Sequence, residues 1–533
     1  MDKSTRRGFL GTAATLGGAV AGLAVGPMAG PASAEDATEA LGMISVGPGD
    51  TRYQDLISRG YNARFTAKPE SVHLVHTTGQ VVSAVTEAVR SGKRVVVRSG
   101  GHCFENFVDD PSAQILIDIS EMNEICFDPR HQAFAVEAGA TLASMYRTLY
   151  LGWGVTVPGG ECPKIGVGGH IAGGGFGPMS RRDGLISDHL YAVEVVVVDQ
   201  SGRAKAVVAT RNPADPNHDL WWAHTGGGGG NFGIVTRYWL RSPNAVGDPS
   251  ALLPKAPGTL LRANVAWPWQ ELTEQAFTRL VRNHGTWHAR NSADGSPYAS
   301  LWSQLTLSHR SLGAVALIAQ LDGALPDAGQ MMTRYIAALT DGVGVTPQIQ
   351  QFTQPWMKAT LGNGFDTQGL DRTKSKDAFL RAAWSDAQIA TVYQYLGDPR
   401  MTGLGGVFVY SYGGRINTVP PAQTAMPHRD SILKAWLTAF WASPEEDEKL
   451  SAWTRDFYRD LYADAGGVPA PNAKYDGAGI NFPDTDLATQ LNTSGVPWQT
   501  LYYKDNYRRL QRIKARWDPR DVFHHALSIR AAR

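Results

Sequence analysis

Three glycine-rich segments constrain what this chain can fold into more than any other feature of its sequence. They span residues 98–104, 158–177 and 226–230, and the last is five consecutive glycines. Glycine supplies 58 of the 533 residues, about 11%, against roughly 7% in ordinary proteins. Backbone without Cβ atoms can bring several N–H groups onto one anion, an arrangement that suits a diphosphate. Since each segment lies near hydrophobic β-type sequence, we predict loops around a cofactor; flexible linkers are the alternative.

The spacing of these glycines disfavours the commonest nucleotide-binding proteins. No segment matches G-x-x-x-x-G-K-[ST], and the residues near Gly166 fail the strict G-x-G-x-x-G register. A formal net charge of +1, from 50 basic and 49 acidic side chains, removes the electrostatic argument for nucleic-acid binding. Three cysteines are too few for a disulfide framework or a four-cysteine zinc site. We therefore predict neither a nucleic-acid partner nor a metal.

Residues 1–34 are predicted to be a bacterial twin-arginine export signal. Arg6 and Arg7 precede a Gly/Ala-rich apolar stretch over 11–30, and Ala32-Ser33-Ala34 forms an A-x-A cleavage site. A transmembrane anchor is the alternative, disfavoured by the glycine-diluted core and the cleavage site. No later segment approaches ~18 uninterrupted apolar residues. We expect a secreted protein that passes through the twin-arginine machinery and has no membrane contact after cleavage.

Hydrophobic patterning predicts strands and helices in both halves of the chain. Apolar residues recur at helical spacing over 81–89, with Thr77 or Thr78 placed to cap that helix. Between 242 and 258 the composition shifts to Pro, Gly and Ala, which indicates a domain boundary. A helical stripe follows over 450–461. Strands are predicted at 72–75, 94–98, 115–119, 190–198, 206–209, 301–307 and 407–412.

Several motifs in one order carry a resemblance to a known family. From about Arg52 to Ile529 the chain resembles the berberine-bridge-enzyme-like flavoprotein oxidases, a branch of the vanillyl-alcohol-oxidase superfamily. It is similar above all to bacterial members such as the hexose oxidases of glycopeptide antibiotic pathways. The motifs are Arg98-Ser-Gly-Gly-His102, the 160–177 loop, Asp219-Leu-Trp-Trp-Ala-His-Thr-Gly-Gly, Tyr502-Tyr-Lys-Asp-Asn-Tyr507 and Asp518-Pro-Arg-Asp-Val-Phe523.

The resemblance implies an α+β fold in several domains. After the signal it predicts a two-part FAD-binding domain of the PCMH type over 35–255, with its characteristic part at about 68–245. A substrate-binding domain with an antiparallel sheet covered by helices is expected over 256–490. The C-terminal berberine-bridge-like segment, 491–533, is expected to return to the FAD domain.

The resemblance also implies that FAD is attached to the protein twice. His102 would bond the 8α-methyl carbon of the flavin and Cys162 would bond C6. A neutral imidazole and a thiolate are nucleophiles suited to an electrophilic ring. A satisfied loop histidine and a small buried thiol are the alternatives. The further predicted FAD-binding residues are Arg98, Ser99, Gly100, Gly101, Gly168, Gly169, His170, Gly173, Gly174, Gly228, Gly229, Asn231, Gly233, Ile234, Val235, Tyr503 and Asn506.

The sequence departs from the family at the expected proton acceptor. Relatives carry a principal tyrosine in Gly-Ala-Tyr-Ile-Asn-Tyr-Pro-Asp, but here 477–484 reads Gly-Ala-Gly-Ile-Asn-Phe-Pro-Asp. Gly479 and Phe482 therefore replace both tyrosines. A free tyrosine has a pKa of ~10, so it needs a nearby cation or hydrogen bond to act near neutrality.

Three interpretations of this departure remain open. Another residue can serve as the base: Tyr412 matches a second tyrosine used by some relatives, and Tyr475 and Tyr503 are nearby in sequence. Of these, Tyr412 and Tyr503 are predicted to be catalytic. Cross-strand packing is the alternative for Tyr412. The substrate can instead be more acidic or carry its own base, with Gly479 enlarging the pocket. Finally, the chain can be a flavoprotein that binds a small molecule without catalysis.

The sequence and the resemblance together predict an exported FAD-dependent oxidase. It would take a hydride from an alcohol or hemiacetal carbon of a sugar or glycosylated secondary metabolite, and O₂ would be reduced to H₂O₂. Oxidation or oxidative cyclisation of a non-sugar metabolite is the alternative. The pocket is expected between the flavin domain and the sheet of the substrate-binding domain, where strand residues could face it. These residues are Trp302, Gln304, Tyr410 and Tyr412.

Overall fold

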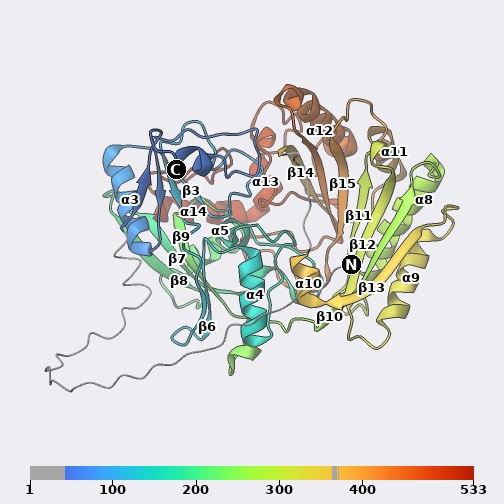
Figure 1. The fold of residues 1–533 in the computed structure, drawn as a ribbon, viewed down its shortest axis with the longest axis horizontal. Coiled ribbons are helices and arrows are strands. Elements are labelled where there is room, and N and C mark those ends of the chain that lie inside the picture. The colour runs from blue at the N-terminus through green and yellow to red at the C-terminus, as the bar shows by residue number, and fades with distance from the viewer. Residues whose placement is uncertain (1–41, 363–368, 370, 533) are drawn as a thin grey trace, which may run out of the picture. The chain divides into compact units, whose positions relative to one another are not determined.

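The computed structural model describes residues 42–362, 369 and 371–532, and the predicted signal at 1–34 lies outside them. From Gly42 onward the chain forms one compact unit. It contains three β-sheets and a larger number of helices (Figure 1), which confirms the predicted α+β class. No helix in the described ranges is long and apolar enough to span a membrane.

The first sheet leads the chain into the first glycine segment. Its order is β1-β2-β4-β3, with β2 and β3 parallel to β4. The valine-rich strand β3 runs straight into that segment. The helix α3 (Thr78–Ser91) begins where the Thr77 side chain accepts a hydrogen bond from the Gln80 backbone N–H. The strands are β1 (Ile44–Val46), β2 (Ser71–Leu74), β3 (Val95–Arg98) and β4 (Ile115–Asp118).

The second sheet holds the other two glycine segments between its strands. It is antiparallel, with the order β5-β6-β9-β7-β8. The α3 helix packs against β4 of the first sheet and against β7, β8 and β9 of the second. The strands are β5 (Ile125–Asp128), β6 (Ala133–Glu137), β7 (Leu190–Val198), β8 (Ala204–Thr210) and β9 (Ile234–Leu240).

The third sheet has eight antiparallel strands, in the order β13-β10-β12-β11-β15-β16-β14-β17. Four helices cover its outer face (Figure 1): α8 (Glu274–Asn291), α9 (Ala328–Thr340), α11 (Asp386–Tyr395) and α12 (Asp447–Leu461). This arrangement confirms the predicted antiparallel sheet with helical cover. The strands are β10 (Thr259–Pro268), β11 (Trp302–Ser308), β12 (Ala314–Asp322), β13 (Gln348–Pro355), β14 (Arg372–Leu380), β15 (Leu404–Ser411), β16 (Leu433–Trp441) and β17 (Tyr475–Gly477).

Cross-strand pairing places polar residues in rows on the uncovered face of this sheet. Gln304 pairs with Tyr410, and Tyr410 pairs with Lys434. A second row joins Arg262 to Gln320 and Gln320 to Trp302. Because side chains alternate along a strand, the leucines of β11 point instead toward the helices.

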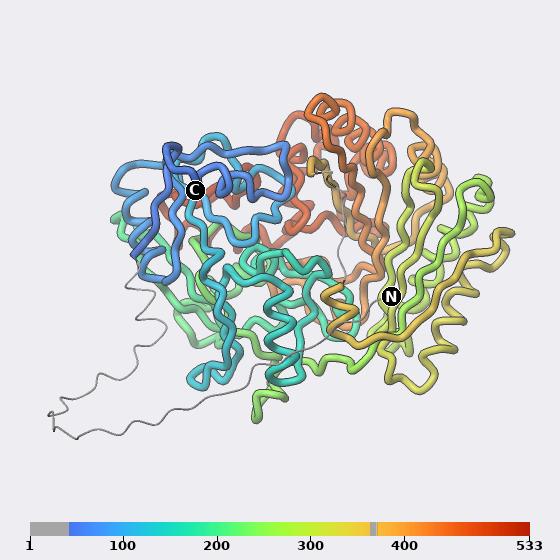
Figure 2. Tube along the Cα trace, in the orientation of Figure 1, coloured from blue at the N-terminus to red at the C-terminus, as the bar shows by residue number. Residues whose placement is uncertain are grey.

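The C-terminal segment lies against the part of the chain that holds the glycine segments. Figure 2 shows its red trace beside the blue N-terminal strands. The Lys514 ammonium donates to the Asn231 carbonyl (2.8 Å), and the Ile529 backbone N–H donates to the Asn231 side-chain oxygen (2.9 Å). Arg94 donates to the His524 carbonyl (3.3 Å). The remaining helices are α2 (Tyr53–Ile57), α4 (Leu142–Trp153), α5 (Val167–Ala172), α6 (Ser180–Asp183), α7 (His218–Ala223), α10 (Trp356–Leu361), α13 (Trp498–Tyr503) and α14 (Tyr507–Trp517).

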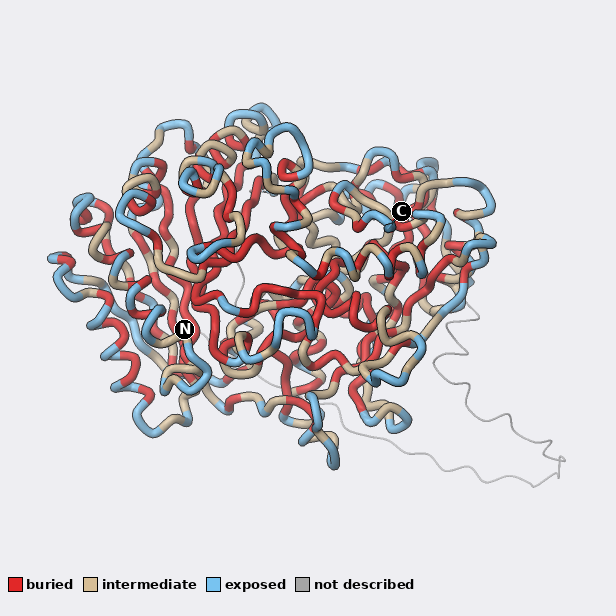
Figure 3. The backbone as a smooth tube through the Cα atoms, turned by 180° about the vertical axis from the view of Figure 1, so that it is seen from behind, coloured by how far each residue is buried: buried red, intermediate tan, exposed pale blue. Residues whose placement is uncertain are grey.

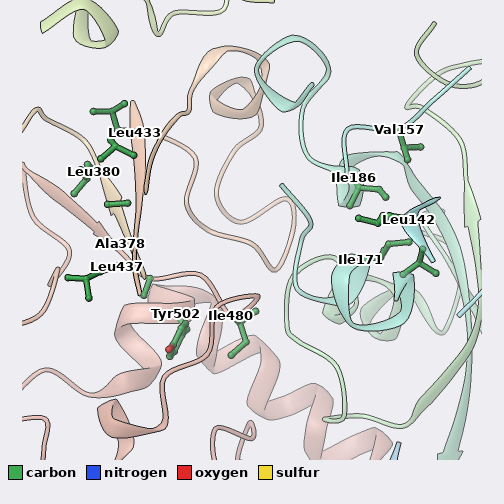
Figure 4. Close-up of a cluster of buried hydrophobic side chains, with 14 of the residues drawn as sticks. Leu142, Val157, Ile171, Ile186, Ala378, Leu380, Leu433, Leu437, Ile480 and Tyr502 are labelled. Carbon is green, nitrogen blue, oxygen red and sulfur yellow. The ribbon is translucent and has the colours of Figure 1, made fainter. Parts of the chain in front are cut away.

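The hydrophobic core runs through both halves of this unit. Buried residues fill the inner strands, whereas the outer loops and helix faces are exposed (Figure 3). Ile171 of the second glycine segment and Leu142 beside that segment belong to the same buried cluster as Leu380, Leu433 and Ile480 (Figure 4). This continuous core fixes the glycine segments relative to the third sheet.

Candidate active site

A cavity of about 420 Å³ lies between the three glycine segments and the uncovered face of the third sheet. It brings together most of the residues predicted from sequence to bind FAD. Those that line it are Ser99, Gly100, Gly101, His102, Cys162, Gly168, Gly169, His170, Gly173, Gly228, Gly229, Gly233, Ile234 and Val235. Trp302, Gln304 and Tyr410 line it from the sheet, as their strand positions predicted.

The glycines at this cavity serve two different purposes. The first and second segments pack backbone against backbone, since a Cβ on Gly100 would lie 2.3 Å from the Gly166 nitrogen. Gly169 instead has no heavy atom within 4 Å of a Cβ position. Glycines such as Gly100 let the loops pack closely, and glycines such as Gly169 leave room for a ligand against the backbone. This cradle fits an extended cofactor with a diphosphate.

His102 and Cys162 lie side by side on the cavity wall. The His102 Nε2 and Cys162 Sγ atoms are 3.5 Å apart, and the Tyr61 ring stacks on the imidazole with centroids 4.0 Å apart. Burial lowers the pKa of His102 to about 4, so its imidazole is neutral near pH 7. Burial raises the pKa of the Cys162 thiol, although the Lys164 and Ile165 backbone N–H groups partly oppose this. Two nucleophilic side chains so close together on the cavity wall are compatible with a flavin that is covalently attached through two of its carbon atoms.

Five residues predicted to bind the cofactor do not line the cavity. Arg98 forms a fully buried ion pair with Asp118 (2.8 Å). The Asn231 amide donates to the Gly227 carbonyl (3.1 Å), and the Asn506 amide donates to carbonyls of the 421–425 turn. These side chains hold the loops in place. The five are Arg98, Gly174, Asn231, Tyr503 and Asn506.

The two tyrosines predicted to be catalytic also do not line the cavity. The Tyr412 hydroxyl is buried and donates to the His428 carbonyl (3.0 Å), and the Tyr503 hydroxyl donates to the Gly227 carbonyl (2.9 Å). The strand β15 ends at Ser411, and the chain turns at Gly413 with a φ of +85°. Tyr412 therefore leaves the pleat that points Tyr410 into the cavity.

Sequence reasoning missed the polar group beside Cys162. Glu161 lines the cavity with Tyr410, and its carboxyl lies close enough to the Tyr410 hydroxyl to interact with it. Arg262 of β10 lies close enough to interact electrostatically with the Glu161 carboxyl. Burial raises the pKa of Glu161 to about 7. The loop sequence around Glu161 did not indicate a functional role, because its partners Arg262 and Tyr410 lie on strands far away in the chain.

Gly479 and Phe482, which stand where the family has tyrosines, lie beside a buried ion pair. The Gly479 backbone N–H donates to Asp377 Oδ2 (2.8 Å), and Asp377 forms a buried ion pair with Lys434. The Lys434 ammonium lies 3.6 Å from the centre of the Phe482 ring. A Cβ on Gly479 would lie 3.0 Å from Asp377 Oδ2. The glycine thus leaves space for this ion pair at the cavity wall.

These features define a FAD-dependent oxidoreductase, and the chain belongs to the berberine-bridge-enzyme-like FAD-linked oxidases. The family model of the FAD binding domain matches residues 69–204, and the model described as berberine and berberine like matches 479–530. Aclacinomycin-N/aclacinomycin-A oxidase of Streptomyces galilaeus is 55% identical over 99% of both chains.

Two solved structures support this membership. Aclacinomycin oxidoreductase is 56% identical with a TM-score of 0.91, over 92% of this chain and 100% of the other. A glycopeptide hexose oxidase complexed with teicoplanin is 51% identical with a TM-score of 0.88, over 92% of this chain and 99% of the other. Family membership makes FAD the cofactor of this chain.

Proposed function

We propose that this chain oxidises an alcohol or hemiacetal carbon of a sugar or of a glycosylated secondary metabolite, with O₂ as the final acceptor and H₂O₂ as the product. The observation that carries the proposal is the cavity, where the His102–Cys162 pair faces the row of polar and aromatic residues on the third sheet. The names of two relatives, aclacinomycin oxidase and glycopeptide hexose oxidase, support this substrate class.

The lining of the sheet side suits a glycosylated ligand. Trp302 and Tyr410 offer large apolar rings, and the Gln304 amide and Tyr410 hydroxyl offer hydrogen bonds. Lys434 and Arg262 add positive charge at the same wall. Rings for stacking, together with a few hydrogen-bonding groups, are what a sugar attached to an aromatic body requires.

We further propose that FAD is bonded to both His102 and Cys162, with glycine backbone N–H groups beside its diphosphate. Bound flavin supplies a two-electron acceptor for the hydride that leaves the substrate carbon. The protein supplies orientation: Tyr61 fixes the His102 ring by stacking, and the Cys162 Sγ atom lies 3.5 Å from His102 Nε2.

The function is tested by mixing the purified flavoprotein anaerobically with aclacinomycin N, aclacinomycin A, teicoplanin and free hexoses. We expect the visible flavin absorbance to bleach with at least one compound, and admitted O₂ to restore it with one equivalent of H₂O₂. Binding without bleaching for every compound would instead favour the non-catalytic flavoprotein. Bleaching by an unglycosylated metabolite alone would favour oxidation of a non-sugar substrate.

We propose export through the twin-arginine pathway on the evidence of residues 1–34. Replacing Arg6 and Arg7 together by lysine should retain the protein in the cytoplasm with its signal uncleaved. Cell fractionation and the mass of the mature N-terminus measure both effects. Secretion of the double variant at the normal level would contradict the proposal.

A further inference from the structure

We propose that Glu161 is the proton acceptor of the oxidation and that the Tyr410 hydroxyl carries the substrate proton to it. The inference rests on the proposed function and adds the group that replaces the family tyrosines. It starts from position: Glu161 directly precedes Cys162, and Tyr410 projects from β15 into the same cavity. The Glu161 carboxyl and the Tyr410 hydroxyl lie close enough to interact there.

Tyr410 cannot easily act as the base alone. Burial raises its pKa well above 10, and the nearby Glu161, Asp377 and Tyr61 raise it further. A phenol beside a carboxylate is a donor to it, and it can accept a proton from a substrate hydroxyl only while it gives its own away. The pair therefore works as a relay with Glu161 at its end.

The surroundings of Glu161 suit a proton acceptor near neutral pH. The titratable and charged groups that face it are Tyr146 from α4, Arg262 from β10, Tyr410 from β15 and Cys162 from its own loop. Burial raises its pKa, and Arg262 and Tyr410 limit the rise to about 7. A base is most effective when its pKa lies near the working pH.

Glu161 also has a way to lose the proton. It lines a second cavity of about 20 Å³, together with Tyr146 and Gln320 among others. A space of that size can hold one water molecule beside polar partners. Because Glu161 lines both cavities, a water molecule in the smaller one would be placed to take up the proton that comes from the substrate side.

The proton step balances. The substrate O–H bond breaks and its proton binds the Tyr410 oxygen, while the Tyr410 O–H bond breaks and its proton binds a Glu161 carboxylate oxygen. Tyr410 ends unchanged, Glu161 ends neutral, and the substrate oxygen becomes a carbonyl oxygen as the hydride departs to the oxidised cofactor. No other reactant is needed.

The first test compares Glu161→Gln, Glu161→Asp and the wild type as holoenzymes. With a compound that bleaches the wild type, the anaerobic reduction rate of Glu161→Gln should fall by about 10²–10⁴-fold. In the wild type this rate should rise as pH increases through about 7, because only the carboxylate accepts the proton. Glu161→Asp should restore part of the rate and keep the pH dependence. Glu271→Gln, at an exposed position, is the control for loss of one negative charge.

The second test does not depend on activity. Infrared difference spectra of the resting holoenzyme should show a protonated carboxyl band that disappears as pH rises through about 7 in the wild type and is absent in Glu161→Gln. Tyr410→Phe should keep the band and shift its titration upward, because the interaction with the Tyr410 hydroxyl, which lowers the Glu161 pKa, is lost.

The outcomes separate this inference from the proposed function. A wild type reduced by no compound contradicts the proposed function. In a wild type that is reduced, a rate that falls less than tenfold in Glu161→Gln, or in Tyr410→Phe, overturns the relay alone. Persistence of the carboxyl titration in Glu161→Gln overturns the assignment of that pKa to Glu161, even if that variant binds flavin poorly.

Discussion

His102 and Cys162 are 60 positions apart in the chain, yet their side chains meet at one point of the cavity wall. The imidazole is neutral there because burial lowers its pKa to about 4. A thiol whose pKa is raised by burial is a weak nucleophile. We therefore expect the bond from His102 to the flavin to form more readily than the bond from Cys162.

Attachment is predicted to survive the loss of either residue alone. His102→Ala and Cys162→Ala should each retain flavin after denaturation, because one bond is enough, whereas the double variant should release it. Mass spectrometry of the denatured chain and fluorescence of the supernatant measure this. The control is Cys126→Ala, whose thiol does not line the cavity. Free FAD released by the denatured wild type would show that neither bond exists.

Lys434 and Asp377 show how a buried charge depends on its partner. Both are nearly inaccessible, and burial lowers the pKa of the lysine and raises that of the aspartate. Lys434→Met should lower the free energy of unfolding by about 3–5 kcal/mol, because Asp377 is left unpaired. Adding Asp377→Asn should recover much of that loss. Urea unfolding of the two variants measures the difference, and equal losses would show that the pair is not coupled.

At the scale of elements, the glycine segments are held by contacts with one another. Gly166 lies at the start of α5, and a Cβ there would lie 2.2 Å from the Gly100 nitrogen. Ser99 adds a hydrogen bond from its hydroxyl to the Ala138 carbonyl (2.6 Å). The cradle therefore requires that the loops of two different sheets approach closely.

Gly166→Ala should disturb this approach and lower the FAD content of the purified protein several-fold. The added Cβ would press against the backbone of Gly100, which cannot move aside as a flexible side chain can. Gly152→Ala is the matched control, since its Cβ would meet nothing within 4 Å at an exposed helical position. The absorbance ratio of flavin to protein measures both variants. Full FAD content in Gly166→Ala would contradict the packing argument.

At the scale of the whole molecule, the C-terminal segment closes the cofactor side of the fold. The Lys514 ammonium donates to the Asn231 carbonyl and to the Phe523 carbonyl (2.7 Å). It also pairs with the Asp518 carboxylate (2.7 Å). His525 stacks on Phe107 with centroids 3.8 Å apart, and both line the cavity. The end of the chain thus completes a site whose loops lie hundreds of residues earlier.

Removal of residues 507–533 should therefore destabilise the glycine loops and reduce cofactor retention. We expect a lower melting temperature and faster proteolysis within 226–234, because the contacts to Asn231 are lost. Removal of 531–533 is the control, since Ala531 and Ala532 are exposed. Thermal unfolding followed by flavin fluorescence compares the two truncations. Equal melting temperatures would mean that the C-terminal segment is dispensable for the site.

The sequence by itself determined the cofactor and the elements around it. The glycine loops and the helix over 81–89 are encoded by residues close together in the sequence, so local pattern was enough to predict them. The motifs around His102 and Cys162 likewise carry their information in consecutive residues. These features were sufficient for the family, which the relatives confirm.

Only the tertiary structure decided which acid–base groups reach the cavity. Tyr412 matched a family tyrosine by sequence, but the end of β15 turns it toward the His428 carbonyl, and Tyr410 faces the cavity instead. Glu161 reaches the cavity from its own loop and Tyr410 reaches it from β15, and the register of β14 with β16 brings Lys434 to Asp377. The physical reason is that a pKa and a proton path depend on burial and on partners brought by folding, which consecutive residues do not encode.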